Sequence, residues 1–174
     1  NACLPDHPSG PSATICPTDD LVAGPLDEAQ AKALFARFGV PVVRERVVTD
    51  AGQAQAAAGE FDGDVVLKLL SEQVLHKSDV GGVAVGVRPE AIADRLAAMR
   101  EDVRMKAGFV PDRFLVQEQV TGGTELILGM FRDPLGTAIL LGTGGVAAEL
   151  FGDTVLRMLP AGGALAHEDA LAMA

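Results

Sequence analysis

The chain has 174 residues, 48% hydrophobic and 22% charged, which is enough for one ordinary domain or two small lobes with a hydrophobic core. Its formal net charge of −10 argues against non-specific nucleic-acid binding, because no basic stripe offsets that charge. No apolar run approaches the roughly 20 residues that span a bilayer, and no leader peptide is recognisable. We therefore expect a cytoplasmic protein with neither membrane nor nucleic-acid partners.

The first 25 residues are rich in Pro, Ser, Asp and Gly, and they predict a linker or tail. Both cysteines, Cys3 and Cys16, fall there without a CxxC motif, so we interpret them as reduced thiols. A helix follows, with Asp27 and Gln30 spaced as a capping box and Gly39 at its end. One face of this helix carries apolar residues, namely Ala31, Leu34, Phe35 and Phe38.

Strands and helices then alternate. "VPVVRERVV" predicts a strand, "TDAGQAQAAAGE" a helix capped by Thr49 or Asp50, and "VVLKLL" a buried strand. "GGVAVGV" predicts another strand, and Pro89 marks the start of a helix. The apolar residues of that helix recur at helical spacing, at Ile92, Leu96, Met99 and Val103. "RFLVQEQV" predicts a further strand.

From Thr121 the pattern changes to strands joined by short turns, with "TELILGMF", "TAILLGTGG", "VAAELF" and "VLRMLP" as strands. We therefore divide the folded chain near Val120, into an α+β lobe over 26–120 and a lobe over 121–174 that opens as an antiparallel sheet. The chain begins with Asn1 and ends in "AHEDALAMA", which is typical of the first turns of a helix, so we expect a fragment of a larger protein.

Three charged residues interrupt apolar strands. Lys68 shares a strand face with Val66 and Leu70 if the strand alternates; it is either an edge-strand lysine in water or a cation that meets an anion. Glu118 and Glu125 are either solvated strand residues or ligands for a metal, a ribose hydroxyl or a lysine. Together with Lys68 they form a set that would suit a ligand site between two lobes.

The segment "HKSDVGG" predicts a polar loop that ends at Gly81 and Gly82. His76 is either a hydrogen-bonded loop residue or an acceptor of a proton or phosphoryl group; the scarcity of other histidines disfavours a metal ligand. The glycine pairs match neither GxGxxG nor GxxxxGK[ST]. A glycine-flanked loop between antiparallel strands can nonetheless donate backbone N–H groups to phosphates.

These segments, in this order, resemble the ATP-grasp domain of NDP-forming acyl-CoA synthetases, a relative of the nucleotide-binding subunit of succinyl-CoA synthetase. The resemblance covers about residues 26–174 and is carried by "HKSDVGG" and by the "ELILGMFRDPLG" signature. It implies an α+β ATP-grasp fold in which two lobes hold ATP between them, with the second lobe, 121–174, incomplete. A homo-oligomer is left open.

On the phosphate side, the resemblance implies that Lys68 and Lys77 contact the nucleotide phosphates. It also implies that the loop at Gly81 and Gly82 covers them. His76 resembles a loop histidine that relays a phosphoryl group in some members of the family.

On the adenine and ribose side, the resemblance implies a role for Glu118 and for the backbone around Gln119 and Val120. It places Glu125 over the phosphates and the metal. The Asp-x-Asn-Pro segment that supplies the main metal ligands in the family would come only after Ala174.

The implied activity is that of an acid-thiol ligase in which a phosphohistidine passes a phosphoryl group to ADP, with ATP/ADP and Mg²⁺ bound. The partners implied are CoA-binding and ligase domains, which this sequence lacks, so we expect the fragment alone to bind nucleotide without turnover. Two alternatives are a regulatory synthetase-like domain of a GNAT protein lysine acetyltransferase and a degenerate domain kept for dimer contacts. The acyl substrate and the choice of ADP or GDP are not specified.

Overall fold

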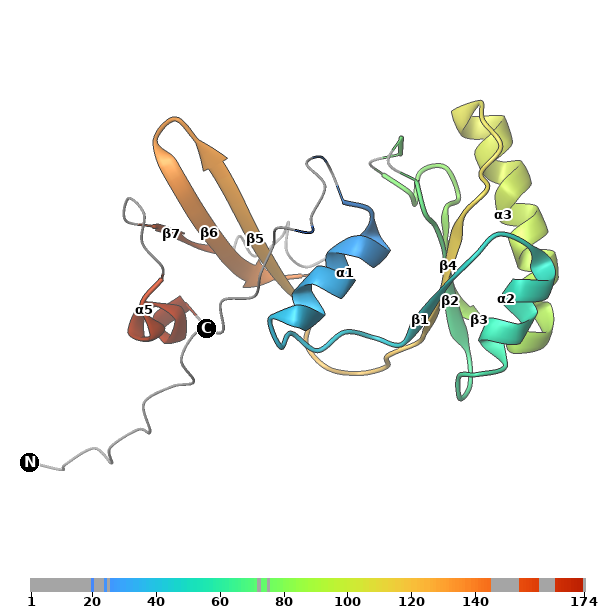
Figure 1. The fold of residues 1–174 in the computed structure, drawn as a ribbon, viewed down its shortest axis with the longest axis horizontal. Helices are drawn as coiled ribbons and strands as arrows, with labels where there is room; N and C mark the ends of the chain where they lie inside the picture. The colour runs from blue at the N-terminus through green and yellow to red at the C-terminus, as the bar shows by residue number, and fades with distance from the viewer. Residues whose placement is uncertain are drawn as a thin grey trace, which may run out of the picture. The chain divides into compact units, whose positions relative to one another are not determined.

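The computed structural model (Figure 1) describes residues 20, 24, 26–71, 73–74, 76–144, 154–159 and 165–173. The chain forms two compact units, and the boundary between them falls between Val120 and Thr121. The predicted tail, both cysteines and the "VAAELF" strand lie outside the described residues.

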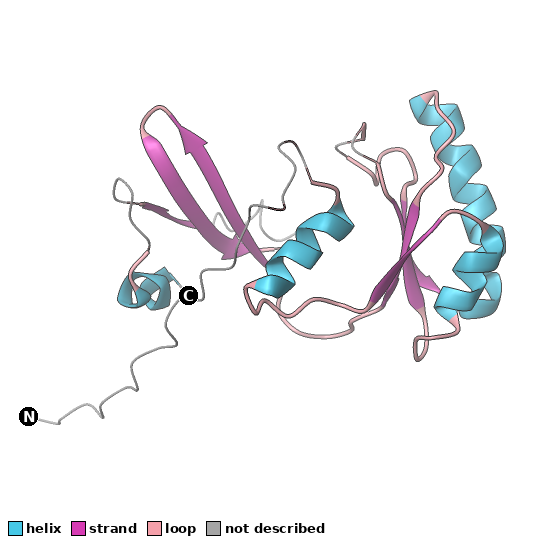
Figure 2. Cartoon of the chain, viewed as in Figure 1, coloured by secondary structure: helices cyan, strands magenta, loops and turns pink. Residues whose placement is uncertain are grey.

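The first unit contains a four-stranded antiparallel sheet with the strand order β1-β4-β2-β3. Figure 2 shows helices α2 and α3 on one face of this sheet and helix α1 on the other. The elements, in chain order, are α1 (Glu28–Arg37), β1 (Glu45–Val48), α2 (Ala51–Ala58), β2 (Val65–Leu69), β3 (Val83–Val87), a 3₁₀ turn (Pro89–Ala91), α3 (Ile92–Ala107) and β4 (Phe114–Glu118).

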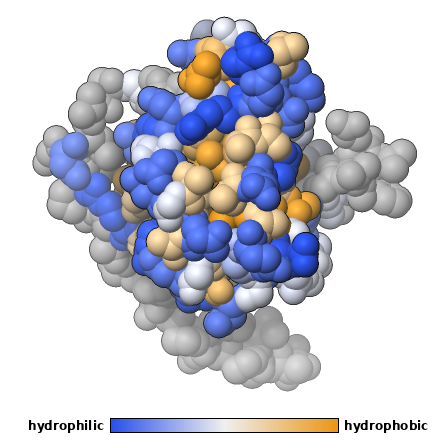
Figure 3. Space-filling model, turned by 90° about the vertical axis from the view of Figure 1, so that its right-hand side faces the viewer, coloured by the Kyte–Doolittle hydropathy of each residue, from blue (hydrophilic) through white to orange (hydrophobic). Residues whose placement is uncertain are grey.

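The hydrophobic core lies between the sheet and helices α2 and α3. Alternation along β2 sends Val65, Leu67 and Leu69 into this core, where they are buried. Helix α3 contributes the four residues that its spacing predicts, and they are its only buried residues: Ile92, Leu96, Met99 and Val103. The predicted α3 face is therefore confirmed. Figure 3 shows that the outer surface of these helices is mainly hydrophilic, with small apolar areas between the polar side chains.

Helix α1 is attached to the sheet in a different way. The predicted capping box is present, since Asp27 accepts a hydrogen bond from the Gln30 backbone and the Gln30 side chain accepts one from the Asp27 backbone. None of the helix residues is buried, and Phe35 is 54% exposed. The apolar face of this helix is thus not packed in the core. Polar contacts described below hold the helix instead.

The second unit contains a three-stranded antiparallel sheet in the order β5-β6-β7. Its strands are β5 (Leu126–Asp133), β6 (Gly136–Thr143) and β7 (Thr154–Met158), and a short helix, α5 (His167–Met173), follows. The change from helix-strand alternation to hairpins after Thr121 is as predicted. None of the helices that the structure describes is both long and apolar enough to cross a membrane.

The buried Met99 and the exposed Met105 of the same helix predict a contrast in the stability of their variants. Met99 is fully buried, so Met99→Ala should lower the free energy of unfolding by about 2–5 kcal/mol through lost contacts and a cavity. Met105 is 68% exposed, and Met105→Ala should change the free energy of unfolding by less than about 0.5 kcal/mol. Guanidinium denaturation followed by circular dichroism measures both. Equal losses would show that α3 does not pack as described.

Candidate functional site

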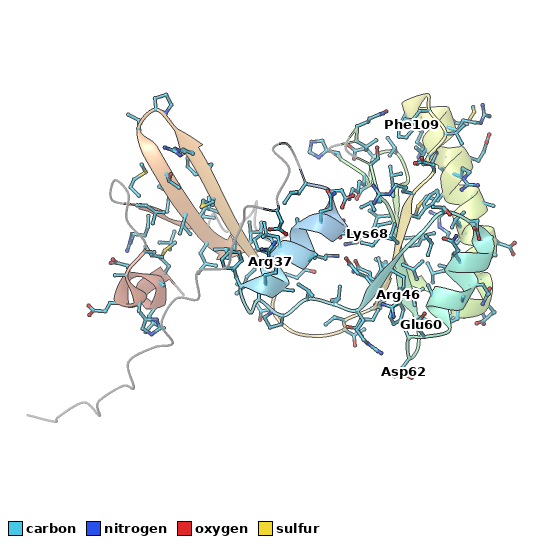
Figure 4. The ribbon with its side chains drawn as sticks, in the orientation of Figure 1. Arg37, Arg46, Glu60, Asp62, Lys68 and Phe109 are labelled. Atoms are coloured by element: carbon cyan, nitrogen blue, oxygen red, sulfur yellow. The ribbon has the colours of Figure 1, made fainter. Side chains whose placement is uncertain are left out.

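Lys68 lies on a central strand, not at the edge of the sheet. Strand β2 has β3 on one side and β4 on the other, so the interpretation of Lys68 as an edge-strand lysine is wrong. The register pairs Lys68 with Leu115 and Val66 with Gln117, which puts these side chains on the face opposite the main core. The Lys68 side chain is 23% exposed and extends toward α1 (Figure 4). Such a half-buried cation on a central strand requires an anionic partner.

That partner is Glu28, in the first turn of α1. Its carboxylate accepts hydrogen bonds from three lysines of different segments. The Glu28 Oε1 atom lies 2.8 Å from Lys32 Nζ and 2.7 Å from Lys68 Nζ, and Oε2 lies 2.9 Å from Lys77 Nζ. We call Glu28 and these three lysines the lysine cluster. It brings together residues of α1, of β2 and of the loop that follows β2.

Lys32 fixes the cluster to the sheet. Besides Glu28, its ammonium group donates hydrogen bonds to the Glu45 carboxylate of β1 at 2.7 Å and to the Gln117 side-chain oxygen of β4 at 3.0 Å. Glu45 and Gln117 are paired in the β1-β4 register and therefore lie on the same face as Lys68. A second link joins Arg113, next to β4, to the buried Asp27 cap at 3.0 Å. These contacts hold α1 against this face.

The electrostatics of the cluster keep Glu28 ionised. Burial raises the pKa of the Glu28 carboxyl, but the hydrogen bonds from Lys32, Lys68 and Lys77 outweigh burial and lower its pKa to about 2. Burial lowers the pKa of Lys32, whereas its bonds to Glu28 and Glu45 raise it, and the net shift is upward. The three ammonium groups of the cluster, taken with the carboxylates of Glu28 and of the neighbouring Glu45, leave a local excess of one positive charge. The cluster can therefore receive an anion.

The glycine loop is closed tightly beside this cluster. The Gly82 N–H donates to the Lys77 carbonyl at 2.7 Å, and the Leu69 N–H donates to the Gly82 carbonyl at 2.7 Å. A Cβ at Gly82 would lie 2.9 Å from the Lys77 oxygen, so only glycine fits there. Gly81 has φ +75°, a conformation that also favours glycine. These constraints position Lys77, whose side chain is 20% exposed.

His76 stands at the start of this loop, and the residue is exposed. Its backbone carbonyl accepts a hydrogen bond from the Asp79 N–H at 3.2 Å, which forms part of the turn. The imidazole is thus placed next to Lys77 in sequence and is open to solvent. Accessibility is one requirement of a phosphoryl acceptor, while the Lys77 ammonium group itself lies on Glu28.

Glu118 lies on the other face of the sheet from Lys68, because its register partner is Val65. Its carboxylate binds Arg44, at 2.8 Å from the backbone nitrogen and 2.7 Å from Nε. The bonds from the Arg44 backbone and then from its guanidinium hold the pKa of Glu118 below its usual value. Gln119 accepts a hydrogen bond from the Gly86 N–H at 2.6 Å, and Val120 is 68% exposed. Glu118 therefore does not join the lysine cluster.

Glu125 belongs to the second unit, where it precedes β5 and is exposed. Its backbone carbonyl accepts a hydrogen bond from the Gly144 N–H at 2.7 Å, next to the end of β6. In the part of the chain that is described, no group of three or more His, Cys, Asp or Glu side chains could hold a metal ion.

Sequence reasoning missed Glu28 and Lys32. The signal was present, because a glutamate and a lysine four residues apart at the start of a helix form an ion pair on one side of it. It did not indicate that Lys68 and Lys77 would share the same carboxylate. A cavity of about 480 Å³ also lies at the end of β2, near Leu70 and Phe109, but neither Lys68 nor Lys77 lines it.

The family model of the ATP-grasp domain matches residues 22–173. A curated relative, the β subunit of ADP-forming acetate–CoA ligase I from Pyrococcus furiosus, is 34% identical over 154 residues, which are 86% of this chain and 64% of that protein.

Solved structures of related proteins are similar to this chain in fold as well as in sequence. Acetyl-coenzyme A synthetase 1 of Ca. Korarchaeum cryptofilum, in complex with coenzyme A, Ca-AMPCP and HgCl⁺, is 38% identical with a TM-score of 0.76, over 85% of this chain and 64% of that one. A Mg-AMPPCP complex of that enzyme, whose phosphohistidine segment points towards the nucleotide-binding site, is 35% identical with a TM-score of 0.61, over 85% and 61%.

The chain therefore spans a little under two thirds of these relatives. They are acyl-CoA ligases and synthetases, and they give no support to the alternative of an acetyltransferase regulatory domain. The match over residues 22–173, with the α+β sheets described above, shows that this chain belongs to the ATP-grasp domain family.

Proposed function

We propose that this chain is the nucleotide-binding part of an ADP-forming acyl-CoA synthetase, in which it exchanges a phosphoryl group between ATP/ADP and a phosphohistidine. The observation that carries the proposal is the pair of half-buried ammonium groups of Lys68 and Lys77, which lie on one Glu28 carboxylate beside a tight glycine loop. Cations that converge next to a glycine-rich loop suit a nucleotide's phosphates. The relatives' complexes with Ca-AMPCP and Mg-AMPPCP support the same assignment.

Each part of the site then has a role. Lys68 and Lys77 bind the phosphates and offset the charge that develops on them during transfer. The Gly81-Gly82 loop covers the phosphates. Glu118, with the backbone of Gln119 and Val120, holds the adenine and ribose at the end of β4.

His76 is the proposed phosphoryl acceptor or relay. The γ-phosphorus of ATP forms a bond with an imidazole nitrogen while its bond to the bridging oxygen breaks, and ADP leaves with that oxygen. The reverse step makes ATP. Glu125 and Mg²⁺ belong to the same proposal, with the main metal ligands in a segment that follows Ala174 in the family. The CoA-binding and ligase domains of the same protein or of a partner subunit would supply the acyl phosphate chemistry.

Lys68→Met should weaken ATP binding by about tenfold or more, since it removes a charge-assisted hydrogen bond to phosphate. Isothermal titration calorimetry of the chain measures the change. Lys106→Met is the matched control, because Lys106 is an exposed lysine in the last turn of α3 and its loss should leave the affinity unchanged. Equal affinities of the Lys68→Met variant and the unmodified chain would refute the assignment of Lys68.

His76→Asn should abolish phosphoryl transfer in the protein assembled with its CoA-binding and ligase partners, while ATP affinity stays within about twofold. The physical reason is that the amide cannot form the N–P bond, although it keeps the polar character of an exposed loop residue. Acid-labile ³²P on the protein and ATP formation from acyl-CoA, phosphate and ADP measure the effect. A His76→Asn enzyme with full turnover would show that His76 is not the relay.

A further inference from the structure

The three lysines of the cluster use their hydrogen-bond donors unequally. An ammonium group has three N–H donors and no acceptor. Lys32 uses all three, on Glu28, Glu45 and Gln117. Within the described part of the chain, Lys68 and Lys77 each donate one hydrogen bond, to Glu28, and the other two donors of each make no hydrogen bond there.

We propose that Glu28 is a positioning residue of the nucleotide site, whose carboxylate orients the Lys68 and Lys77 ammonium groups toward the phosphates while Lys32 holds that carboxylate in place. This inference rests on the proposed function, which assigns Lys68 and Lys77 to the phosphates. It extends the function of the site to helix α1, which contributes no buried residue to the fold.

The geometry favours positioning over competition between Glu28 and the phosphates. The donors of an ammonium group point to the corners of a tetrahedron, so a bond to Glu28 directs the other two away from Glu28. A phosphate oxygen can accept these donors without displacing the carboxylate. Without Glu28, two like charges on long flexible side chains would separate and move toward water. Nucleotide binding would then have to order both side chains again, which lowers affinity.

Lys32 belongs to the same argument. Its bonds to Glu45 and Gln117 tie the Glu28 carboxylate to strands β1 and β4, which flank the face from which Lys68 projects. Removal of Lys32 should therefore loosen Glu28 and weaken phosphate binding in the same direction as removal of Glu28. Because the two residues act through one contact, their effects should not add.

Calorimetric titration of the full chain with ATP, inorganic tripolyphosphate and adenosine tests the inference. Glu28→Gln should weaken the binding of ATP and of tripolyphosphate by about tenfold each and leave the binding of adenosine unchanged, because only the phosphate contacts change. Glu28→Asp should recover part of the loss, and Lys32→Met combined with Glu28→Gln should bind no more weakly than Glu28→Gln alone. Glu101→Gln is the control, since Glu101 pairs with Arg104 on the outside of α3.

The outcomes separate this inference from the proposed function. Tighter ATP binding by Glu28→Gln would show that Glu28 competes with phosphate, and would overturn the positioning role. Unchanged ATP binding by Glu28→Gln, with loss in Lys68→Met, would overturn it while the proposed function stands. If Lys68→Met binds ATP normally, the assignment of Lys68 to the phosphates fails, and the inference that rests on it fails as well. Circular dichroism confirms folding, and Glu28→Asp and Lys32→Met provide the test if Glu28→Gln does not fold.

The pKa of Glu28 predicts how its contribution to stability depends on pH. The folded-state pKa of about 2 lies below the usual value of 4.5, so the contribution is present above about pH 4.5 and is lost as the pH falls toward 2. The charged groups around the Glu28 carboxylate are the ammonium groups of Lys32, Lys68 and Lys77, and the Glu45 carboxylate that Lys32 also contacts. The difference in melting temperature between the unmodified chain and Glu28→Gln should therefore shrink over this range. A constant difference would show that the carboxylate is not stabilised by these lysines.

Discussion

The arrangement of the first unit depends on one carboxylate that serves three ammonium groups. Glu28 connects helix α1, the central strand β2 and the glycine loop, and these segments are joined there by no other charged contact among the described residues. Hydrophobic packing contributes less here than in the core, because α1 has no fully buried residue and its Ala31 and Leu34 are only partly buried. Sets of buried or half-buried charges cost desolvation energy that only close pairing offsets. The cluster is therefore maintained by charge pairing, in contrast to the core on the other face of the sheet.

The contacts on one face of this sheet can be predicted from the sequence more completely than the contacts on the other. The core face follows local rules, so the residues at helical spacing in α3, such as Leu96 and Met99, are the ones that are buried. The Asp27 and Gln30 capping box forms as its spacing predicts, because both partners belong to the same helical turn. Local sequence patterns are sufficient to predict a contact wherever the interacting residues are neighbours in sequence.

The site face follows from strand order and register, which no local pattern encodes. Whether Lys68 stands in water or against a carboxylate depends on β2 lying between β3 and β4, with β4 arriving from more than 40 residues further along the chain. Glu118 is a similar case. The pleat alternates along the strand, and pairing with Val65 sends this glutamate to the face opposite Lys68. The predicted set of Lys68, Glu118 and Glu125 therefore lacks Glu28, which is the carboxylate that Lys68 contacts. Glu28 joins the cluster through contacts 40 and 49 residues away.

An acidic chain that binds a polyanion needs its cations arranged before the ligand arrives. The net charge of −10 repels ATP in general, although salt screens that repulsion beyond about 8–10 Å. In the proposed site, binding must then come from contacts within a few ångströms, made by the N–H donors of Lys68 and Lys77 and favoured by the single excess positive charge that the three lysines leave over Glu28 and Glu45. If charge alone is counted, a carboxylate within a cation site lowers the affinity for an anion. Counted by donors, the proposed role of Glu28 is to keep two mobile side chains in one place and to leave most of their hydrogen bonds for the phosphates, so that local geometry and not long-range attraction would set the strength of binding.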